Sequence, residues 1–363
     1  MTPTDHAHMT RALRLAERGL YTTTPNPRVG CVIARGEEIV GEGFHERAGE
    51  PHAEIHALRR AGSNARGATV YVTLEPCSHH GRTPPCADAL VEAGVSRVVA
   101  AMQDPNPQVA GRGLERLRAA RIAVECGLYE TQARELNIGF VARMTRARPW
   151  LRIKTAASLD GGTALRNGQS QWITGAAARR DGHRWRARSC AVMVGVGTLL
   201  ADNPRLTVRE IKTTRQPLRI VVDRELEIPL GARVLEGGNA LIVTAQDHPE
   251  KVRQLEQLGA QVVWLPNREG KVDLAALMRE LARRELNEVL VESGSRLNGA
   301  LLRAGVVDDL IVYLAPHLLG DSARGMFDLG ELTALEQRVE FTIRDVRRIG
   351  SDLRMVGRLT QGN

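Results

Sequence analysis

Residues 51–77 read PHAEIHALRRAGSNARGATVYVTLEPC, and this stretch decides how the first part of the chain folds. The run TVYVTL at 69–74 is short and apolar on both faces, as is the run RVVAAM at 97–102. Strands of this kind are buried between helices, and the helix that joins these two ends at Gly94, as in a right-handed parallel crossover. The sequence therefore predicts an α/β sheet covered by helices.

The alternation of helix and strand extends from residue 9 to about 145 and resumes after a break at 148–150, RPW. Proline disfavours helix in the residue before it, which supports a boundary here. Beyond the break, strands separated by helices again indicate a mainly parallel sheet, and the tail EFTIRDVRRIGSDLRMVGRL at 340–359 is typical of two antiparallel edge strands. Because a domain has roughly 100 to 200 residues, we expect two domains, 1–147 and 148–363.

The composition is that of a soluble globular protein, with 43% hydrophobic and 25% charged residues. No run approaches the ~18 apolar residues of a membrane span, and the beginning MTPTDHAHMTRALRLAERG is charged where an export signal is apolar. We therefore expect a cytoplasmic protein that is not bound to a membrane. Five cysteines without a dense framework indicate metal or thiol chemistry in a reducing compartment, and Cys31, Cys126 and Cys190 are expected to pack in the interior.

The net charge of +8 bears on the class of partner. The arginines are scattered in short clusters such as RRDGHRWRAR, and 3% aromatic residues leave few platforms on which single-stranded bases could stack. A solvated basic surface and small phosphorylated substrates are therefore favoured over nucleic acid. The alternative is a nucleic-acid base deaminase whose C-terminal half is a binding module.

A candidate zinc site lies within and just beyond the opening stretch. His52 begins a helix, Cys77 ends a strand, and Cys86 begins the next helix after an eight-residue loop. One histidine and two thiolates leave the fourth zinc position to water, which is the arrangement of a catalytic site. Glu54 is not needed as a ligand and can move the proton of that water, as in the zinc base deaminases.

Several alternatives remain open at this site. The cysteine spacing departs from the P-C-x-x-C pattern of these deaminases, and the zinc could instead be structural. His79 and His80 could be alternative ligands, although contact with substrate is the favoured reading. His45 and Asn26 are further candidates for contact with a base.

The segments TTTPNPRVGCVI, GEPHAEIHAL, YVTLEPCSHHGRTPPC and MQDPNPQVAGRG, together with KTAASLDGGTAL and SQWIT, carry a family resemblance. They resemble the bifunctional deaminase/reductase family of bacterial riboflavin biosynthesis nearly end to end, and that family's long cysteine loop matches the eight-residue spacing. The resemblance implies an N-terminal cytidine-deaminase-like three-layer α/β domain and a C-terminal dihydrofolate-reductase-like α/β domain.

The same resemblance implies two consecutive reactions. The first is zinc-dependent hydrolytic deamination of 2,5-diamino-6-(5-phosphoribosylamino)pyrimidin-4-one. The second is reduction of its ribosyl chain with NADPH, which gives 5-amino-6-(5-phosphoribitylamino)uracil. Zn²⁺ and NADPH are thus the expected cofactors, and we also expect a homo-oligomer.

In the second half, a glycine-containing turn after the apolar run EVLVE precedes a helix, whose first amides can hold a phosphate. Lys154 and Asp160 are further pocket candidates, and Asp202 could orient or protonate near the nicotinamide. We expected Arg186 and Arg209 to hold a phosphate bidentately. The resemblance matches a set of cofactor positions, to which Arg224 is added because it follows the strand RIVVD. These positions are Ala156, Trp172, Thr198, Asp202, Arg224, Gly294, Ser295, Arg296, Leu297, Asn298, Gly299 and Ala300. The matched substrate positions are Ser170, Arg186, Leu206, Arg209 and Glu292.

Overall fold

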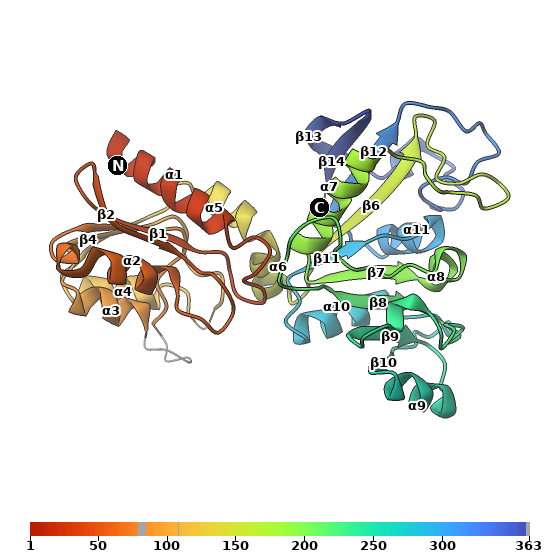
Figure 1. Cartoon of the computed structure of the whole chain (residues 1–363), viewed down its shortest axis with the longest axis horizontal. Helices are drawn as coiled ribbons and strands as arrows, with labels where there is room; N and C mark the ends of the chain where they lie inside the picture. Colours follow the sequence, from red (N-terminus) through yellow and green to blue (C-terminus); the bar gives the residue numbers. More distant parts are fainter. Residues whose placement is uncertain (79–84, 108, 361–363) are drawn as a thin grey trace. The chain divides into compact units, whose positions relative to one another are not determined.

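The computed structural model describes residues 1–78, 85–107 and 109–360. The chain divides into two compact units, Met1–Ala147 and Arg148–Asn363, each built around its own sheet (Figure 1). The two-domain α/β class expected from the sequence is thus confirmed. No helix in the described part of the chain is both long enough and apolar enough to cross a bilayer.

Unit 1 contains a sheet whose described strands follow the order β2-β1-β3-β4-β5. The hairpin strands β1 and β2 are antiparallel, β1 also pairs antiparallel with β3, and β3, β4 and β5 run parallel. The parallel crossover predicted between the runs at 69–74 and 97–102 is confirmed. The strands are β1 Gly30–Arg35, β2 Glu38–Phe44, β3 Thr69–Val72, β4 Arg97–Ala100 and β5 Ala123–Cys126.

Helices cover both faces of this sheet. Figure 1 shows α1 and α5 on one face, and α2, α3 and α4 on the other. The helices are α1 Pro3–Glu17, α2 Ala53–Ala61, α3 Cys86–Glu92, α4 Arg112–Ala119, α5 Glu130–Leu136 and α6 Ile138–Arg146, with a 3-10 turn at Gly62–Ala65.

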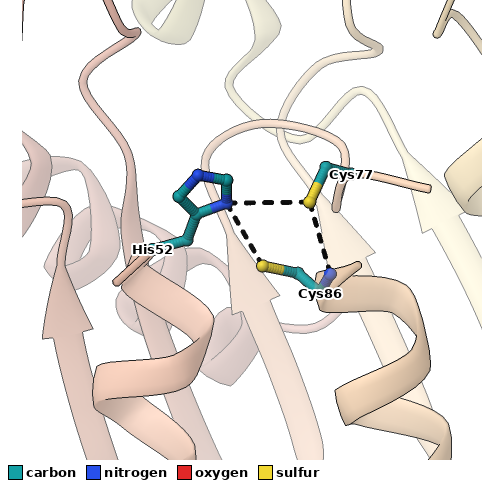
Figure 2. Close-up of side chains that lie close together, drawn as sticks. All are labelled: His52, Cys77 and Cys86. Carbon is teal, nitrogen blue, oxygen red and sulfur yellow. Dashed lines mark hydrogen bonds between the residues drawn. The ribbon is translucent and has the colours of Figure 1, made fainter. Parts of the chain in front are cut away.

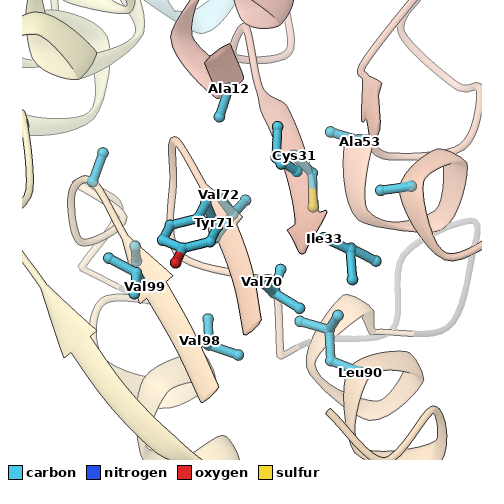
Figure 3. Close-up of a cluster of buried hydrophobic side chains, with 14 of the residues drawn as sticks. Ala12, Cys31, Ile33, Ala53, Val70, Tyr71, Val72, Leu90, Val98 and Val99 are labelled. Carbon is cyan, nitrogen blue, oxygen red and sulfur yellow. The ribbon is translucent and has the colours of Figure 1, made fainter. Parts of the chain in front are cut away.

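The core of unit 1 is filled from both faces of the central strands (Figure 3). Val70 and Val72 of β3 and Val98 of β4 are fully buried, as the apolar runs predicted. Removal of such side chains from water is the main stabilising contribution to a domain of this size. Of the three cysteines expected to pack, Cys31 and Cys190 are buried, but Cys126 is exposed because β5 is the edge strand.

Glycine in β2 permits the close approach of the helix that begins at the candidate metal site. A Cβ atom on Gly43 would lie 2.5 Å from the Cβ of His56 and 2.6 Å from the carbonyl oxygen of Ala53. Both neighbours belong to α2, so only a residue without a side chain lets α2 pack this closely on the sheet. The position of Glu54 near the start of α2 depends on that packing.

Unit 2 contains a longer sheet of order β10-β9-β8-β7-β11-β6-β12-β14-β13 among its described residues. The strands from β10 to β12 are parallel, whereas β14 and β13 are antiparallel at one edge, as predicted from the tail. The strands are β6 Trp150–Ser158, β7 Ala191–Gly195, β8 Leu218–Val222, β9 Ala240–Thr244, β10 Ala260–Trp264, β11 Glu288–Val291, β12 Asp309–Ala315, β13 Phe341–Ile349 and β14 Asp352–Leu359.

The helices of unit 2 connect these strands. Crossovers between parallel strands require such connections, which explains the regular alternation of the two element types in the sequence. The helices are α7 Ala176–Arg188, α8 Val196–Asp202, α9 Pro249–Gln257, α10 Leu274–Arg283 and α11 Ser295–Arg303, with 3-10 turns at Arg233–Leu235 and Leu335–Gln337.

Candidate functional sites

Three elements of unit 1 bring a histidine and two cysteines together (Figure 2). His52 caps the start of α2, Cys77 follows β3, and Cys86 is the first residue of α3. Their donor atoms all lie within 4.8 Å of one another, and the Nδ1 atom of His52 is 3.6 Å from the Cys77 sulfur and 3.3 Å from the Cys86 sulfur. A tetrahedral zinc ion with ordinary bond lengths separates a sulfur and a nitrogen ligand by ~3.6 Å. The cluster therefore fits zinc in both donor type and spacing.

The backbone around the second cysteine orients the sulfur of the first. The Cys86 amide donates to the Cys77 sulfur at 3.3 Å, and the Ala87 amide donates to the Cys77 carbonyl at 3.1 Å. Hydrogen bonds from Cys86 and His52 hold the pKa of Cys77 well below that of an ordinary thiol. A thiolate is the form that binds metal.

Glu54 lies in the first turn of α2, two residues after His52, and is 3% exposed. Its Oε2 atom is buried and has no hydrogen-bond partner among the described residues. Burial raises the pKa of Glu54 to about 7. A buried carboxylate oxygen without a partner is costly, so its presence beside the cluster indicates a place where another molecule binds.

His45 and Asn26 border the cluster. The His45 ring lies edge-on to the His52 ring at 5.3 Å, and its Nδ1 atom is 3.1 Å from the Pro51 carbonyl oxygen. Because a carbonyl oxygen only accepts, Nδ1 carries the proton, and Nε2 accepts from the Asn26 amide at 3.1 Å. The other two histidines considered at this site, His79 and His80, lie outside the described residues.

A cleft of about 2100 Å³ lies in unit 2 at the carboxyl ends of the parallel strands β7, β8 and β11. This is where ligands bind in open parallel sheets. Of the expected cofactor positions, Asn298 and Gly299 do not line the cleft. Asn298 is buried with its amide on two carbonyls, and a Cβ on Gly299 would lie 1.7 Å from the Asp328 carbonyl oxygen. The remaining expected positions all line it: Ala156, Ser170, Trp172, Arg186, Thr198, Asp202, Leu206, Arg209, Arg224, Glu292, Gly294, Ser295, Arg296, Leu297 and Ala300.

Arg186 and Glu292 form a two-bond ion pair in this cleft. Nε of Arg186 donates to Oε1 of Glu292 at 2.6 Å, and Nη2 donates to Oε2 at 2.9 Å. Burial alone would raise the pKa of Glu292, but the charge and hydrogen bonds of Arg186 bring it down to about 2. The carboxylate of Glu292 occupies one side of the Arg186 guanidinium group, and the expected bidentate contact of Arg186 with a phosphate stays a prediction.

Arg209 has a different environment. Its guanidinium contacts only the neighbouring Thr207 among the bonds described, at 3.0 Å to the hydroxyl oxygen, and its backbone amide donates to Nδ1 of His183 at 3.2 Å. Burial lowers the pKa of His183 to about 4, so this ring is neutral and carries its proton on Nε2. Arg209 is thus the arginine of the expected pair that can reach an anionic group.

Lys154, one of the further pocket candidates, also lines the cleft. Burial lowers the pKa of Lys154, and its Nζ atom lies 5.5 Å from the centre of the Tyr313 ring. Asp160 does not line the cleft. Its carboxylate accepts from the backbone amides of Leu319 and Gly320 instead, so it holds a loop.

The turn before α11 is braced from two neighbouring elements. The Gly294 amide donates to the Thr198 hydroxyl at 3.0 Å, and the Ser293 hydroxyl accepts from the Gly195 amide at 3.0 Å. These bonds hold the start of α11 against β7 and α8, and residues 294–297 line the cleft. Burial raises the pKa of Asp202, at the end of α8, against the opposing effect of a hydrogen bond from Ser170.

The sequence pattern does not predict two residues that organise these sites. His183 lies in the arginine-rich run RRDGHRWRAR, and Glu75 precedes Pro76-Cys77. The partners of both are backbone amides far along the chain, and no local pattern records such partners. The sequence offers one signal for Glu75: it is an acidic residue at the end of an apolar strand, two positions before a metal ligand.

Comparison with known proteins agrees with both sites. Residues 2–102 match the family described as "Cytidine and deoxycytidylate deaminase zinc-binding region", and residues 149–355 match "RibD C-terminal domain". Riboflavin biosynthesis protein RibD of Escherichia coli K12 is 50% identical over 372 residues, which cover 97% of this chain and 99% of the relative. RibD of Aquifex aeolicus is 42% identical, with 96% and 97% covered.

Solved structures give the same result. Acinetobacter baumannii RibD superposes with a TM-score of 0.92 at 44% identity, and 99% of each chain is covered. A Thermotoga maritima diaminohydroxyphosphoribosylaminopyrimidine deaminase/5-amino-6-(5-phosphoribosylamino)uracil reductase superposes with a TM-score of 0.87 at 34% identity, and 98% of this chain and 99% of that chain are covered. The chain therefore belongs to the RibD family of riboflavin biosynthesis, the bifunctional enzymes in which a zinc-dependent deaminase precedes an NADPH-dependent reductase.

Proposed function

We propose that residues 1–147 hydrolyse an amino group of 2,5-diamino-6-(5-phosphoribosylamino)pyrimidin-4-one, and that residues 148–363 then reduce the ribosyl chain. The product is 5-amino-6-(5-phosphoribitylamino)uracil. The observation that carries the proposal is the unpartnered, buried Oε2 atom of Glu54 beside the His52, Cys77 and Cys86 donors. The large cleft of unit 2, with its cationic lining, supports the second reaction.

In the deaminase half, His52, Cys77 and Cys86 would hold the zinc ion, which when bound activates a water molecule for attack. Glu54 moves two protons in turn: it takes one from the attacking water and delivers it to the ring nitrogen, and it then passes the proton of the new hydroxyl group to the departing amine. The water oxygen bonds to the ring carbon, the carbon–nitrogen bond breaks, and ammonia leaves. His45 and Asn26, next to His52, are proposed to contact the pyrimidine.

In the reductase half, NADPH when bound supplies a hydride to C1′ of the sugar. The carbon is reduced, its bond to the ring oxygen breaks, and a proton is added to that oxygen. The start of α11 at Gly294–Leu297 would hold the pyrophosphate, and Arg209 the substrate phosphate. Glu292, fixed by Arg186, would accept hydrogen bonds from the sugar chain.

The two reactions can be tested separately on the purified protein. Supplied with the diaminopyrimidinone, zinc and NADPH, it should release one ammonia and oxidise one NADPH per substrate. A chelator should stop ammonia release but leave NADPH oxidation on 5-amino-6-(5-phosphoribosylamino)uracil intact. A protein that leaves both substrates untouched would refute the assignment. The alternative of a C-terminal nucleic-acid-binding module is not supported, because residues 149–355 match the RibD C-terminal domain.

Arg224 allows a prediction about cofactor choice. It follows β8, lines the cleft, and is half exposed, with Nε on the Gly270 carbonyl at 2.9 Å. A guanidinium group here is suited to the 2′-phosphate that distinguishes NADPH from NADH. Arg224→Ala should raise the KM for NADPH about tenfold, since a charged hydrogen bond contributes roughly 1.5 kcal/mol or more. The KM for NADH should not change.

Steady-state kinetics with both cofactors would check this prediction. Arg253→Ala is a matched control, because Arg253 is an exposed arginine on α9 that does not line the cleft. If the KM for NADH rose as much as the KM for NADPH, Arg224 would contact a part of the cofactor other than the 2′-phosphate.

A homo-oligomer remains part of the proposal, and the edge of the unit 2 sheet supports it. β13 is the edge strand, and its Ile343 and Val346 side chains are each 56% exposed. An exposed edge strand with apolar side chains is suited to pairing with another chain. Ile343→Asp should raise the dissociation constant of the oligomer about 100-fold, as for a buried interface residue.

Light scattering after gel filtration would measure the masses. Leu258→Asp is the control, because Leu258 is also an exposed aliphatic residue but lies after α9, away from this edge. A monomeric wild type, or a variant of unchanged mass, would contradict the proposed interface. The cytoplasmic location also remains a proposal, which cell fractionation would test.

A further inference from the structure

One buried carboxylate in unit 1 accepts four backbone hydrogen bonds. Glu75 is 3% exposed, and it lies three residues after the end of β3 and two before Cys77. All four donors belong to one segment, at 104–114. They are the amides of Asp104 at 3.0 Å and Gly111 at 2.9 Å to Oε2, and of Gly113 at 2.8 Å and Leu114 at 3.3 Å to Oε1.

This arrangement solves a local problem at the start of α4. The helix begins after Gly111, which has no side chain that could accept from the first amides of the helix. Such amides need a partner, and a negative charge is the most favourable one at a helix N-terminus. Glu75 supplies this negative charge from the segment after β3. Because these amides are already paired with a carboxylate, they are not available to bind a substrate phosphate.

The packing at this point leaves little room for movement. A Cβ atom on Gly113 would lie 1.9 Å from the Pro76 carbonyl oxygen, and Gly111 has a φ of +83°, which favours glycine. The Glu75 amide also donates to the Met102 carbonyl at 2.9 Å. Met102, Asp104 and the start of α4 are therefore all tied to the residue two positions before a metal ligand.

We propose that Glu75 is a positioning residue for the deamination reaction, which holds Asp104, Gly111 and the start of α4 beside Cys77 as one wall of the substrate site. The inference rests on the proposed deaminase function. Glu75 touches neither the metal nor the reacting atoms. It acts through the residues that it holds, which include the polar Asp104, whose carboxylate accepts from the Asn106 amide at 2.8 Å.

Glu75→Gln tests this role, because an amide group accepts on one side only and would place its own donors against two backbone amides. We expect the deaminase kcat/KM to fall about 100-fold, mostly through KM, because a misplaced contact of about 1 Å has an effect of this size. Zinc content should stay at one per chain, and reduction of 5-amino-6-(5-phosphoribosylamino)uracil should be unchanged.

Asp5→Asn is the matched control. Asp5 is a buried carboxylate of the same unit, 1% exposed, and it pairs with Arg97 and Tyr71 away from the segment 102–114. We expect this variant to lower the thermal midpoint of unit 1 while leaving the deaminase KM within about twofold of the wild type. An equal rise of KM in both variants would overturn the proposal, because general loosening of the unit would then explain it.

Hydrogen exchange on the wild type provides a test that does not depend on folding of a variant. Amides in peptides covering 103–114 should be protected before ligand is added, and 5-amino-6-(5-phosphoribosylamino)uracil should increase that protection. Glu75→Gln should abolish the initial protection while the peptide of β3 stays protected.

Three further results would overturn the inference. These are an unchanged kcat/KM in a Glu75→Gln protein of lowered thermal midpoint, loss of zinc from that variant, and no effect of the ligand on the wild-type peptides. A wild type that does not deaminate would instead refute the proposed function itself. An active wild type with an unaffected variant refutes only the role of Glu75.

Discussion

Glu54→Gln should lower the kcat of deamination about 10³-fold, because general acid–base catalysis contributes typically 10²- to 10⁴-fold. Glutamine has nearly the same shape as glutamate but cannot take up and return a proton at neutral pH. Glu54 is 3% exposed and its Oε2 atom has no partner among the described residues, so the substitution breaks no hydrogen bond there. The metal cluster and the fold should therefore persist.

The measurement is ammonia release, with zinc content and NADPH oxidation recorded on the same preparation. The reductase activity on 5-amino-6-(5-phosphoribosylamino)uracil should equal that of the wild type, which makes it an internal control for folding. Glu37→Gln, in the exposed turn after β1, controls for the loss of one negative charge. If Glu54→Gln deaminates normally, the zinc is structural and the proton carrier is another group.

Arg186→Leu should abolish reduction and destabilise unit 2 by about 3 to 5 kcal/mol, which is typical when one partner of a buried ion pair is removed. The side chains of Arg186 and Glu292 are only 14% and 15% exposed. Without the guanidinium group, only the weaker effects of Lys154 and His183 oppose the effect of burial on Glu292, whose pKa should then rise. The carboxyl group in the cleft becomes neutral or remains as an uncompensated charge.

The pH dependence of stability distinguishes this explanation from simple loss of packing. In the wild type the pKa of Glu292 is lowered to about 2, so its contribution to stability is complete above the unfolded pKa near 4.5 and is lost as the pH falls toward 2. In Arg186→Leu the pKa is raised, so folding is least favourable at high pH. The difference in unfolding free energy between the two proteins should narrow as the pH falls from 8 to 5.

Urea unfolding at several pH values would check this, together with reductase assays. Arg184→Leu is the control, because it makes the same substitution on α7 at a side chain that is 59% exposed. Deamination should remain normal in both variants. If the difference in unfolding free energy between the wild type and Arg186→Leu does not vary with pH, Arg186 acts through packing alone.

Much of the fold could be predicted because it depends on local pattern. Short runs apolar on both faces, such as TVYVTL and RVVAAM, gave buried strands, and the tail after residue 340 gave the antiparallel edge formed by β13 and β14. The exposure of Cys126 could not be predicted in this way. It depends on β5 being the last strand of the sheet, and strand order is set by contacts between distant segments.

The metal cluster was predictable for a chemical reason. Few residue types bind zinc, and His52, Cys77 and Cys86 each stand at an element boundary that the local pattern locates. The residues that line the cleft of unit 2 were less predictable. Asn298 and Gly299 belong to the expected turn, yet they face the interior because α11 turns these two positions away from the cleft.

The amino-acid sequence by itself predicted the order of the elements, the cluster of His52, Cys77 and Cys86, and the place of Glu54 beside it, because residue type and short spacing specify all three. The tertiary structure alone decided which buried charges pair. Arg186 meets Glu292 across 106 residues, and Glu75 meets amides up to 39 residues away. A buried polar group takes its partner from whichever segments the fold brings within about 3 Å, and no local pattern encodes that choice.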